Sequence, residues 1–449
     1  IGEKMYKYFI VIAFAILACT SNAQQTISLD AAKSMALSQN ATYQAARAGV
    51  EATRWQKKNA FAAFLPNLSL GGTFLYTDPA RSINTGGQSI ALNKDQRSVS
   101  LNLSQPLFTG GKLYQAYKMA SLAATVAETG LMAEKLELVY DVENKYYSVL
   151  QLNKVYEIAQ AELSQAESNL ELAQIKIQNG LMARADLLRL QANLANKEIA
   201  LLQTKTAYDL ALRDFSNFLG SQELLNPLPV ELDDSEILPF ADFDEQKLER
   251  FSHSLKTIGI TENLNLKQIQ GGVELSQRAY KASKGSFLPT LTLVGSRSYD
   301  ENGIDRYEFD ASNQIMLNLS VPLLPQIGNL AASRKAYYEA QKTAMAAKDA
   351  TDGILLATDS AALKLVSSAR QVKNAKLSLD ITEDMYAQIS ERFRLNMVST
   401  VDLMDAELML SAANMAYANA YYEFFKARLT LLNTIGKEDA AILTDILDR

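Results

Sequence analysis

Cysteine, histidine and proline are all scarce in this sequence. Its 449 residues include one cysteine, Cys19, one histidine, His253, and nine prolines. A single thiol cannot form a disulfide within the chain, and one cysteine with one histidine cannot supply a tetrahedral Cys/His metal site. We therefore expect no metal site, and we interpret His253 as an ordinary surface or capping side chain.

Basic charge is also lacking, since the formal net charge is −6 and no Lys/Arg-rich run occurs. This balance argues against nucleic-acid binding. The GxSxG, HExxH and GxGxxG motifs are absent, and Gly110-Gly111-Lys112 is not a phosphate loop because Pro106 stands where the first glycine is needed. The sequence thus offers no catalytic residue and no cofactor site, and a periplasmic enzyme has nothing to support it.

Apolar runs long enough for a transmembrane helix are lacking as well. The run from Tyr8 to Ala18 follows two lysines and precedes Ser21-Asn22-Ala23, a small-x-small cleavage site. It is too short to span a bilayer, so we predict a signal peptide over residues 1–23. Cys19 lies where a lipidation cysteine would lie, and it is either lipidated or discarded with the signal.

Proline is absent from residues 107–226 and 326–449, so both stretches are free to form long helices. Apolar residues follow a 3,4 spacing through the first stretch, which predicts coiled-coil packing. This seam is Val149, Leu152, Tyr156, Ala159, Leu163, Ala166, Leu170, Ala173 and Ile177. Shifted by 216 residues it becomes Leu365, Ser368, Val372, Ala375, Leu379, Thr382, Tyr386, Ile389 and Phe393.

Each long helix is expected to turn back on itself. Gly180 and Asn396 occupy equivalent positions and suit a C-cap, and Thr400 and Asp402 are placed to start the second return helix. A return seam with 4,3 spacing is expected on the first hairpin, at Leu188, Ala192, Ala195, Ile199 and Leu202.

The chain carries an internal duplication. Leu101 to Leu107 (LNLSQPL) reappears as Leu317 to Leu323 (LNLSVPL), and Phe64 to Leu70 (FLPNLSL) reappears as Phe287 to Leu293 (FLPTLTL). These segments alternate apolar and polar residues, which is typical of strands with two different faces. About ten residues each is enough for a tilted strand to cross a bilayer. Four strands cannot close a membrane sheet, so several copies of the chain must pool them.

These residues carry a family resemblance. The run from Gln105 to Lys112 (QPLFTGGK), the paired Phe-Leu-Pro strand starts and the turn from Asn396 to Asp402 (NMVSTVD) resemble the TolC-like outer-membrane efflux proteins, from about Ile27 to Lys437. The resemblance implies a homotrimer in the outer membrane of a Gram-negative bacterium. Twelve strands would make one barrel, continued in the periplasm by an α-helical barrel. A periplasmic adaptor (membrane fusion) protein and an inner-membrane transporter would be its partners.

Together these observations predict a mostly α fold with four transmembrane strands per chain. We expect a first repeat over 24–225, with strands at about 65–77 and 97–107 and a helical hairpin at about 110–219. An acidic linker covers 226–254, and its residues Glu231 to Glu249 are interpreted as a solvated loop. A second repeat spans 255–437, with strands at about 288–299 and 308–323 and a hairpin at about 327–435. Residues 438–449 form a short tail. The second repeat lacks the Gly-Gly pair at its strand-to-helix junction.

The hairpin tips are the first candidate site. The resemblance implies that they meet the adaptor, and exposed apolar residues at a tight turn suit a partner's helical tips. The alternative is simple turn capping, with the Leu and Met side chains packed inward. The tip residues are Asn179, Gly180, Leu181, Met182, Leu395, Asn396, Met397 and Val398.

Asp380, Glu383 and Asp384 are the second candidate site. Tripled by symmetry, they would form a carboxylate ring at a periplasmic gate that favours cations. The alternative is an ordinary solvated helix face. The predicted function is a passive, gated channel for efflux or type I secretion, and the cargo cannot be read from the sequence. The alternative is an extracellular or periplasmic coiled-coil protein with a structural or adhesive role, which would have no use for four amphipathic strands.

Overall fold

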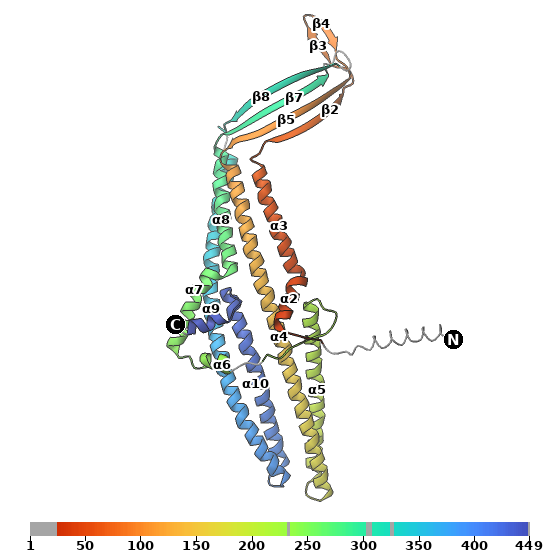
Figure 1. Cartoon of the computed structure of the whole chain (residues 1–449), viewed down its shortest axis with the longest axis vertical. Coiled ribbons are helices and arrows are strands. Elements are labelled where there is room, and N and C mark those ends of the chain that lie inside the picture. Colours follow the sequence, from red (N-terminus) through yellow and green to blue (C-terminus); the bar gives the residue numbers. More distant parts are fainter. Residues whose placement is uncertain (1–24, 231–233, 302–307, 324–326, 448–449) are drawn as a thin grey trace, which may run out of the picture. The chain divides into compact units, whose positions relative to one another are not determined.

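The computed structural model describes residues 25–230, 234–301, 308–323 and 327–447. The predicted signal peptide and Cys19 lie outside the described residues. The chain divides into two compact units. The first unit comprises the residues up to Ala45, Ala133–Asn263 and the residues from Gly353 onward, and the second comprises Ala46–Met132 and Leu264–Asp352. Each unit is described by itself, with the elements labelled as in Figure 1.

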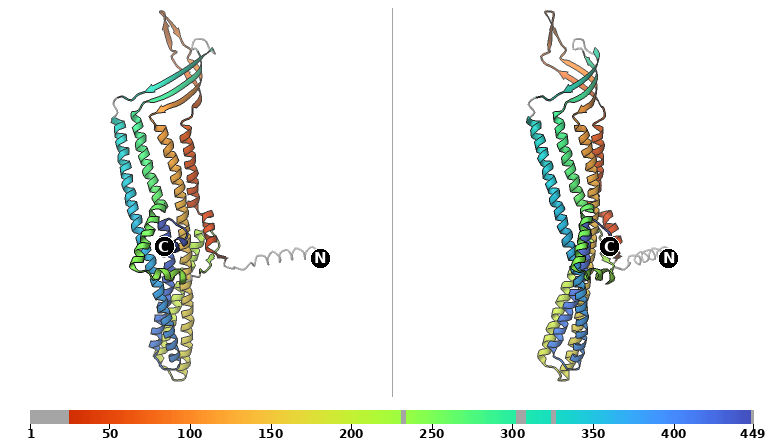
Figure 2. Two further views of the ribbon diagram at one scale, coloured as in Figure 1. Left: turned by 60° about the vertical axis from the view of Figure 1, so that its left-hand side comes forward. Right: turned by 90° about the vertical axis from the view of Figure 1, so that its left-hand side faces the viewer.

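The second unit contains a four-stranded antiparallel sheet (Figure 2). Its order is β2-β5-β7-β8, from strands β2 (Asn67–Tyr76), β5 (Asp95–Thr109), β7 (Thr290–Glu301) and β8 (Phe309–Ser320). Their apolar positions pair across the sheet, as Leu70 does with Leu101 and Leu293 does with Leu317. The alternating pattern thus gathers most apolar side chains on one face of the sheet.

Two further strand pairs were not predicted. Strands β3 (Ser82–Thr85) and β4 (Gln88–Ala91) form a hairpin in the longer loop of the first repeat. Its turn is Gly86-Gly87, and both glycines have positive φ, the conformation that a two-residue hairpin turn requires. In the first unit, β1 (Gln25–Ile27) pairs in parallel with β6 (Leu225–Pro227).

Glycine determines the junction between sheet and helices in the second unit. Gly110 has φ +63°, and a Cβ placed on it would lie 2.2 Å from the carbonyl oxygen of Gly285. A Cβ on Gly285 would in turn lie 2.4 Å from the carbonyl oxygen of Gly110. The two backbones therefore exclude any side chain at either position. Around this junction lie α3 (Ala41–Ala62), α8 (Leu264–Lys284) and the short 3₁₀ helix η1 (Gly285–Phe287).

The long helices form two hairpins, α4 (Lys112–Gln178) with α5 (Arg184–Phe218) and α9 (Ile327–Arg394) with α10 (Thr400–Ile435). All nine seam residues expected on α4, and all nine on α9, are buried or half-buried. The predicted fold class, mostly α with four strands, is confirmed. Among the described residues, no helix combines the length and the apolar character needed to cross a membrane.

The return seam expected on α5 does not pack within the single chain. Leu188, Ile199 and Leu202 are 56%, 55% and 68% exposed. The inward face instead carries buried or half-buried residues with the same 3,4 spacing, two of which are polar. These are Leu187, Leu190, Leu194, Lys197, Leu201, Thr204, Tyr208, Ala211 and Phe215. Helix α5 has two apolar stripes, and the purely apolar one faces outward.

The interpretation of residues 231–249 as a solvated loop is wrong where the structure describes them. The region holds α6 (Asp234–Ala241) and the start of α7 (Glu245–Glu262). Phe240, Phe243 and Phe251 are buried in a hydrophobic cluster with residues of α9 and α10 and with Leu443 of α11 (Ala441–Leu447). Acidic residues marked this segment as polar, but its aromatic residues are spaced to cover one side of the second hairpin.

A second hydrophobic cluster in the first unit joins the start of the chain to the first hairpin. Ala32 and Ala36 of α2 (Leu29–Gln39) pack with α4 and with Phe215 of α5. Phe425 of α10 belongs to this cluster and stacks on Tyr147 with ring centroids 4.6 Å apart. Its neighbour Phe424 belongs to the first cluster. Helix α10 therefore contributes to both clusters, and the two hairpins share a continuous core.

Candidate functional site

The two hairpin tips have the same backbone conformation. Gly180 and Asn396 both adopt positive φ, at 71° and 62°. The N–H of Gly180 donates to Ile177 O at 2.9 Å, and the N–H of Leu181 donates to Lys176 O at 2.8 Å. Asn396 and Met397 repeat both bonds at the end of α9, to Phe393 and Arg392. This pair of bonds is the Schellman motif, in which a left-handed residue satisfies the last helix carbonyls.

The apolar side chains next to these caps point outward. Leu181, Leu395 and Met397 are 60%, 57% and 71% exposed, whereas Met182 and Val398 are half-buried. Gly180 and Asn396 thus act as caps, as the alternative interpretation requires. The inward packing that it also requires is absent for three of the five apolar residues. Each tip therefore exposes apolar surface on a fixed turn.

The return helices start differently. Ser399 is the N-cap of α10, one residue before the predicted start at Thr400, and its hydroxyl accepts a hydrogen bond from the N–H of Asp402 at 3.2 Å. Asp402 completes a capping box by accepting the N–H of Ser399 at 2.9 Å. The hydroxyl of Ser399 also donates to the Asp402 carboxylate at 2.7 Å, and this bond, with the one from the Ser399 N–H, holds the pKa of Asp402 below its ordinary value. The equivalent N-cap of α5 is Ala183, which has no side-chain cap.

A buried lysine joins the first tip to the second. Lys176 near the end of α4 is 5% exposed, and its ammonium donates to the backbone carbonyl oxygen of Phe393 on α9. The same nitrogen lies 3.9 Å from the centroid of the Phe393 ring. Burial lowers the pKa of Lys176. The sequence suggested no special role for Lys176, because its partner lies 217 residues further along the chain.

A second link between the hairpins centres on Glu407 of α10. Its carboxylate accepts hydrogen bonds from the side-chain amides of Asn169 on α4 and Asn193 on α5, the latter at 2.9 Å. Burial raises the pKa of Glu407 above its ordinary value, and the two amide bonds oppose that shift. Asn169 is 5% exposed, so this network replaces water at a polar point inside the bundle.

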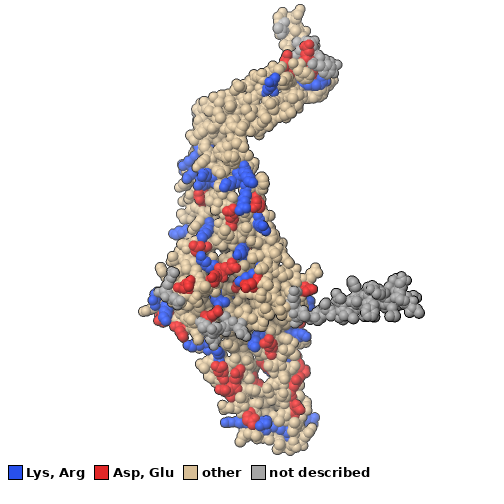
Figure 3. All heavy atoms as spheres, viewed as in Figure 1, with Lys and Arg blue, Asp and Glu red and all other residues tan. Residues whose placement is uncertain are grey.

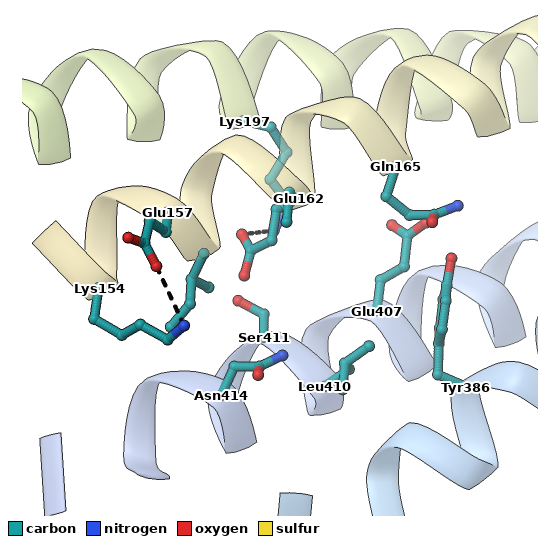
Figure 4. Close-up of a pocket in the computed structure, with 12 residues that line it drawn as sticks. Lys154, Glu157, Glu162, Gln165, Lys197, Tyr386, Glu407, Leu410, Ser411 and Asn414 are labelled. Carbon is teal, nitrogen blue, oxygen red and sulfur yellow. Dashed lines mark hydrogen bonds and ion pairs between the residues drawn. The ribbon is translucent and has the colours of Figure 1, made fainter. Parts of the chain in front are cut away.

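Beside Glu407 lies a cavity of about 340 Å³ (Figure 4). Its lining includes Glu162 from α4, Lys197 from α5 and Tyr386 from α9. Lys197 pairs with Glu162 at 2.7 Å, which leaves the cavity without a strong surplus of either charge. The long separations in sequence between these residues explain why no motif indicated the cluster.

The acidic candidates Asp380, Glu383 and Asp384 are all exposed on α9. Within one chain they contact no common group, so the carboxylate ring stays a prediction that only an assembly would test. His253 is an exposed residue of α7. Within the described ranges, no three His, Cys, Asp or Glu side chains gather as metal ligands would.

Comparison with known proteins identifies a matching family and several relatives. The family described as "Outer membrane efflux protein" matches residues 32–221 and 260–437. The alkaline protease secretion protein AprF of Pseudomonas aeruginosa is 24% identical over 91% of this chain and 84% of its own. The outer membrane protein TolC of Salmonella enteritidis is 24% identical over 87% of this chain and 78% of its own.

Solved structures share the fold. The CmeC outer membrane channel of Campylobacter jejuni superimposes with a TM-score of 0.78 at 15% identity, over 94% of this chain and 89% of that one. The transmembrane channel protein CusC gives a TM-score of 0.77 at 16% identity, over 91% of this chain and 92% of that one. The two matched segments of the family correspond to the two copies of the duplication.

Proposed function

The chain belongs to the outer membrane efflux protein family, and from this premise we propose that three copies of it form the exit channel of a tripartite export machine. It is an outer-membrane channel protein of the efflux and secretion class, which excludes the alternative of an extracellular structural coiled coil. The relatives are channel or secretion proteins, not enzymes. We further propose that this chain is a passive duct with no catalytic step and no cofactor.

The sheet supports assembly into an oligomer. Strands β2 and β8 are its two edges, and every residue of both strands is exposed in the single chain. Each unpaired backbone group in lipid costs several kcal/mol. Pairing β8 of one copy with β2 of the next removes both edges. Three copies supply twelve strands, which is enough to close a cylinder, whereas one copy supplies too few.

The long helices support the same assembly. In the single chain α4 contacts α10, for example through Gln151 and Asn419 at 2.8 Å, which leaves α5 and α9 for other neighbours. The outward stripe of α5, at Leu188, Ile199 and Leu202, has coiled-coil spacing. Helix α9 exposes a comparable stripe, with Leu356, Leu363, Leu377 and Ile381 between 54% and 71% exposed. We propose that these stripes meet between neighbouring copies.

The tips are the proposed docking site for a periplasmic adaptor, which would connect the channel to an inner-membrane transporter. The supporting observation is the exposure of Leu181, Leu395 and Met397 on turns whose conformation is fixed by hydrogen bonds. A rigid apolar projection can enter a partner's groove at little entropic cost. Asp380, Glu383 and Asp384 remain our proposal for an acidic gate, on the strength of their exposure near this end of α9.

Acidic substitutions at the tips test the docking proposal without disturbing the caps. The double variant Leu181→Glu/Met397→Glu should reach the membrane as trimers yet lose export and lose cross-linking to the adaptor. Leu238→Glu on α6, another exposed leucine, is the matched control and should export normally. Normal export by the double variant would refute docking at the tips. A wild-type chain that stays monomeric and soluble without detergent would refute the channel itself.

A further inference from the structure

The four helix ends that border the sheet carry only positive charge. Residues 52–65, 109–127, 275–288 and 327–338 contain three, two, three and two Lys or Arg, and no Asp or Glu. In Figure 3, Lys and Arg side chains gather on the helices beside the uncharged part of the sheet. All of these residues belong to the second unit. We call them the basic collar: Arg54, Lys57, Lys58, Lys112, Lys118, Arg278, Lys281, Lys284, Arg334 and Lys335.

Most of the collar is not neutralised within the chain. Arg54 and Arg278 pair with glutamates further from the sheet, and Lys335 lies 3.7 Å from Glu339. The other seven form no salt bridge within the part of the chain that the structure describes: Lys57, Lys58, Lys112, Lys118, Lys281, Lys284 and Arg334. Their charge is therefore available to an external anion.

Aromatic rings accompany these lysines on three helices; Trp55 and Tyr114 are exposed and Tyr280 is half-buried. The ammonium of Lys58 lies 3.8 Å from the centroid of the Trp55 ring on α3, and that of Lys284 lies 4.4 Å from Tyr280 on α8. Lys118 and Tyr114 on α4 repeat the pair at 5.7 Å. Each ring lies within about seven residues, or roughly 10 Å, of the helix end next to the sheet. Such a pair presents an apolar ring and a cation together, which suits the boundary between lipid chains and water.

The strands place this boundary. Residues 67–76, 98–109, 290–296 and 311–320 contain no charged side chain. Charged side chains return at the far end of the sheet, but there both signs occur together, with Lys94 paired to Asp78 at 2.6 Å and Arg97 paired to Asp95 at 2.9 Å. Of the two ends of the sheet, in the residues that the structure describes, the end that borders the helices carries basic side chains and no acidic ones. An acidic protein would also be attracted by this charge, but it would have no need of aromatic rings at the edge of an uncharged band.

We propose that the basic collar binds the phosphate head groups of acidic phospholipids in the leaflet that borders the helices. This inference rests on the proposed function, because it requires the sheet to lie in the outer membrane. The lysines contact phosphate oxygens, while the neighbouring rings lie between the head groups and the acyl chains. A lysine near an anionic surface contributes enough to change lipid affinity about fivefold. The collar therefore selects the lipids around the channel and fixes its depth.

Native mass spectrometry tests this proposal. The full-length trimer is released from nanodiscs that contain equal amounts of phosphatidylglycerol and phosphatidylcholine, and the lipids that stay bound are identified. The wild type should retain phosphatidylglycerol preferentially, and high salt should weaken the preference. The variant K58Q/K118Q/K284Q keeps its aromatic rings and should lose about fivefold in preference for each lysine that a lipid contacts. The matched control K205Q/K247Q/K364Q removes three other exposed lysines and should behave as wild type.

An unchanged phosphatidylglycerol preference in K58Q/K118Q/K284Q would overturn the collar proposal, whether or not the variant exports. If the variant also lost export, the collar would be assigned to an acidic protein partner. Failure of the proposed function is distinguishable from both, because the wild-type chain would then not enter nanodiscs as a trimer.

Discussion

The two helical hairpins began as one repeated unit, yet their return helices now do different work. Helix α10 buries thirteen of its 36 residues, whereas α5 buries four of 35. Leu202 on α5 is 68% exposed, and Ala418, its equivalent at an offset of 216, is 5% exposed. Helix α10 packs against α4 and the core clusters, while α5 keeps an apolar face for a neighbour. The two hairpins therefore share the same backbone arrangement, but sequence differences between them leave α10 as the return helix that packs in the core of the subunit.

The tips show the same division in smaller features. Both keep the Schellman motif, but only the second return helix has a capping box, at Ser399 and Asp402. Lys176 is buried against the second tip, whereas its equivalent Arg392 is exposed. Glu407 is half-buried where the first repeat has the exposed Gln191. Each hairpin therefore supplies one charged group to the polar links between them, Lys176 from the first and Glu407 from the second.

The largest effect should come from placing a charge on each return helix. Ala418→Asp puts a carboxylate into the packed interior and should lower the free energy of unfolding by about 3–5 kcal/mol. Leu202→Asp should leave the helical content unchanged and remove the trimer. Circular dichroism and light scattering in detergent separate the two results. An intact trimer in Leu202→Asp would contradict the proposed contact between copies.

Removing the buried lysine should have the next largest effect. Lys176→Met keeps most of the apolar stem and removes the charged donor to Phe393, so it should destabilise the tips by about 1.5–3 kcal/mol. Hydrogen exchange in residues 173–182 and 390–398 measures the loss. Arg392→Met is the matched control, and it should leave exchange at both tips nearly unchanged because Arg392 is exposed.

Removing the N-cap side chain of α10 and adding one to α5 should each change the free energy of unfolding by about 1 kcal/mol, in opposite directions. Ser399→Ala removes the capping box and should speed hydrogen exchange in the first turn of α10. Ala183→Ser introduces an N-cap hydroxyl and should slow exchange in the first turn of α5. If both substitutions shift exchange in the same direction, the difference between the two caps is not what sets the stability of the return helices.

The smallest effect concerns pH. Because burial raises the pKa of Glu407, the folded chain holds a proton that the unfolded chain has released between the ordinary pKa and the raised one. Stability should therefore fall as pH rises through that window. Glu407→Gln, which copies the first repeat, should reduce this slope in unfolding measurements at several pH values. If the dependence of the unfolding free energy on pH were unchanged in this variant, it would have to come from other titratable groups.

The sequence predicted most of the fold for local reasons. Proline-free stretches and the 3,4 spacing located both hairpins, alternation located the four long strands, and Gly180 and Asn396 marked the turns. The β3–β4 hairpin has a readable signal in Gly86-Gly87, because two adjacent glycines favour the positive φ of a two-residue turn. The acidic residues of 231–249 favoured the prediction of a solvated loop. The phenylalanines between them instead pack against residues of α9 and α10.

Sequence by itself thus determined the repeat, the element types and the turn positions, because each depends on residues that are close along the chain. Tertiary structure alone decided which stripe of α5 faces inward, since Lys197 and Thr204 interrupt the inner stripe and the outer stripe is uninterrupted. It also decided the partners of Lys176 and Glu407, which lie 217 and 238 residues away. Periodicity shows that a helix has an apolar face, but the element that covers the face is fixed only when distant helices pack together.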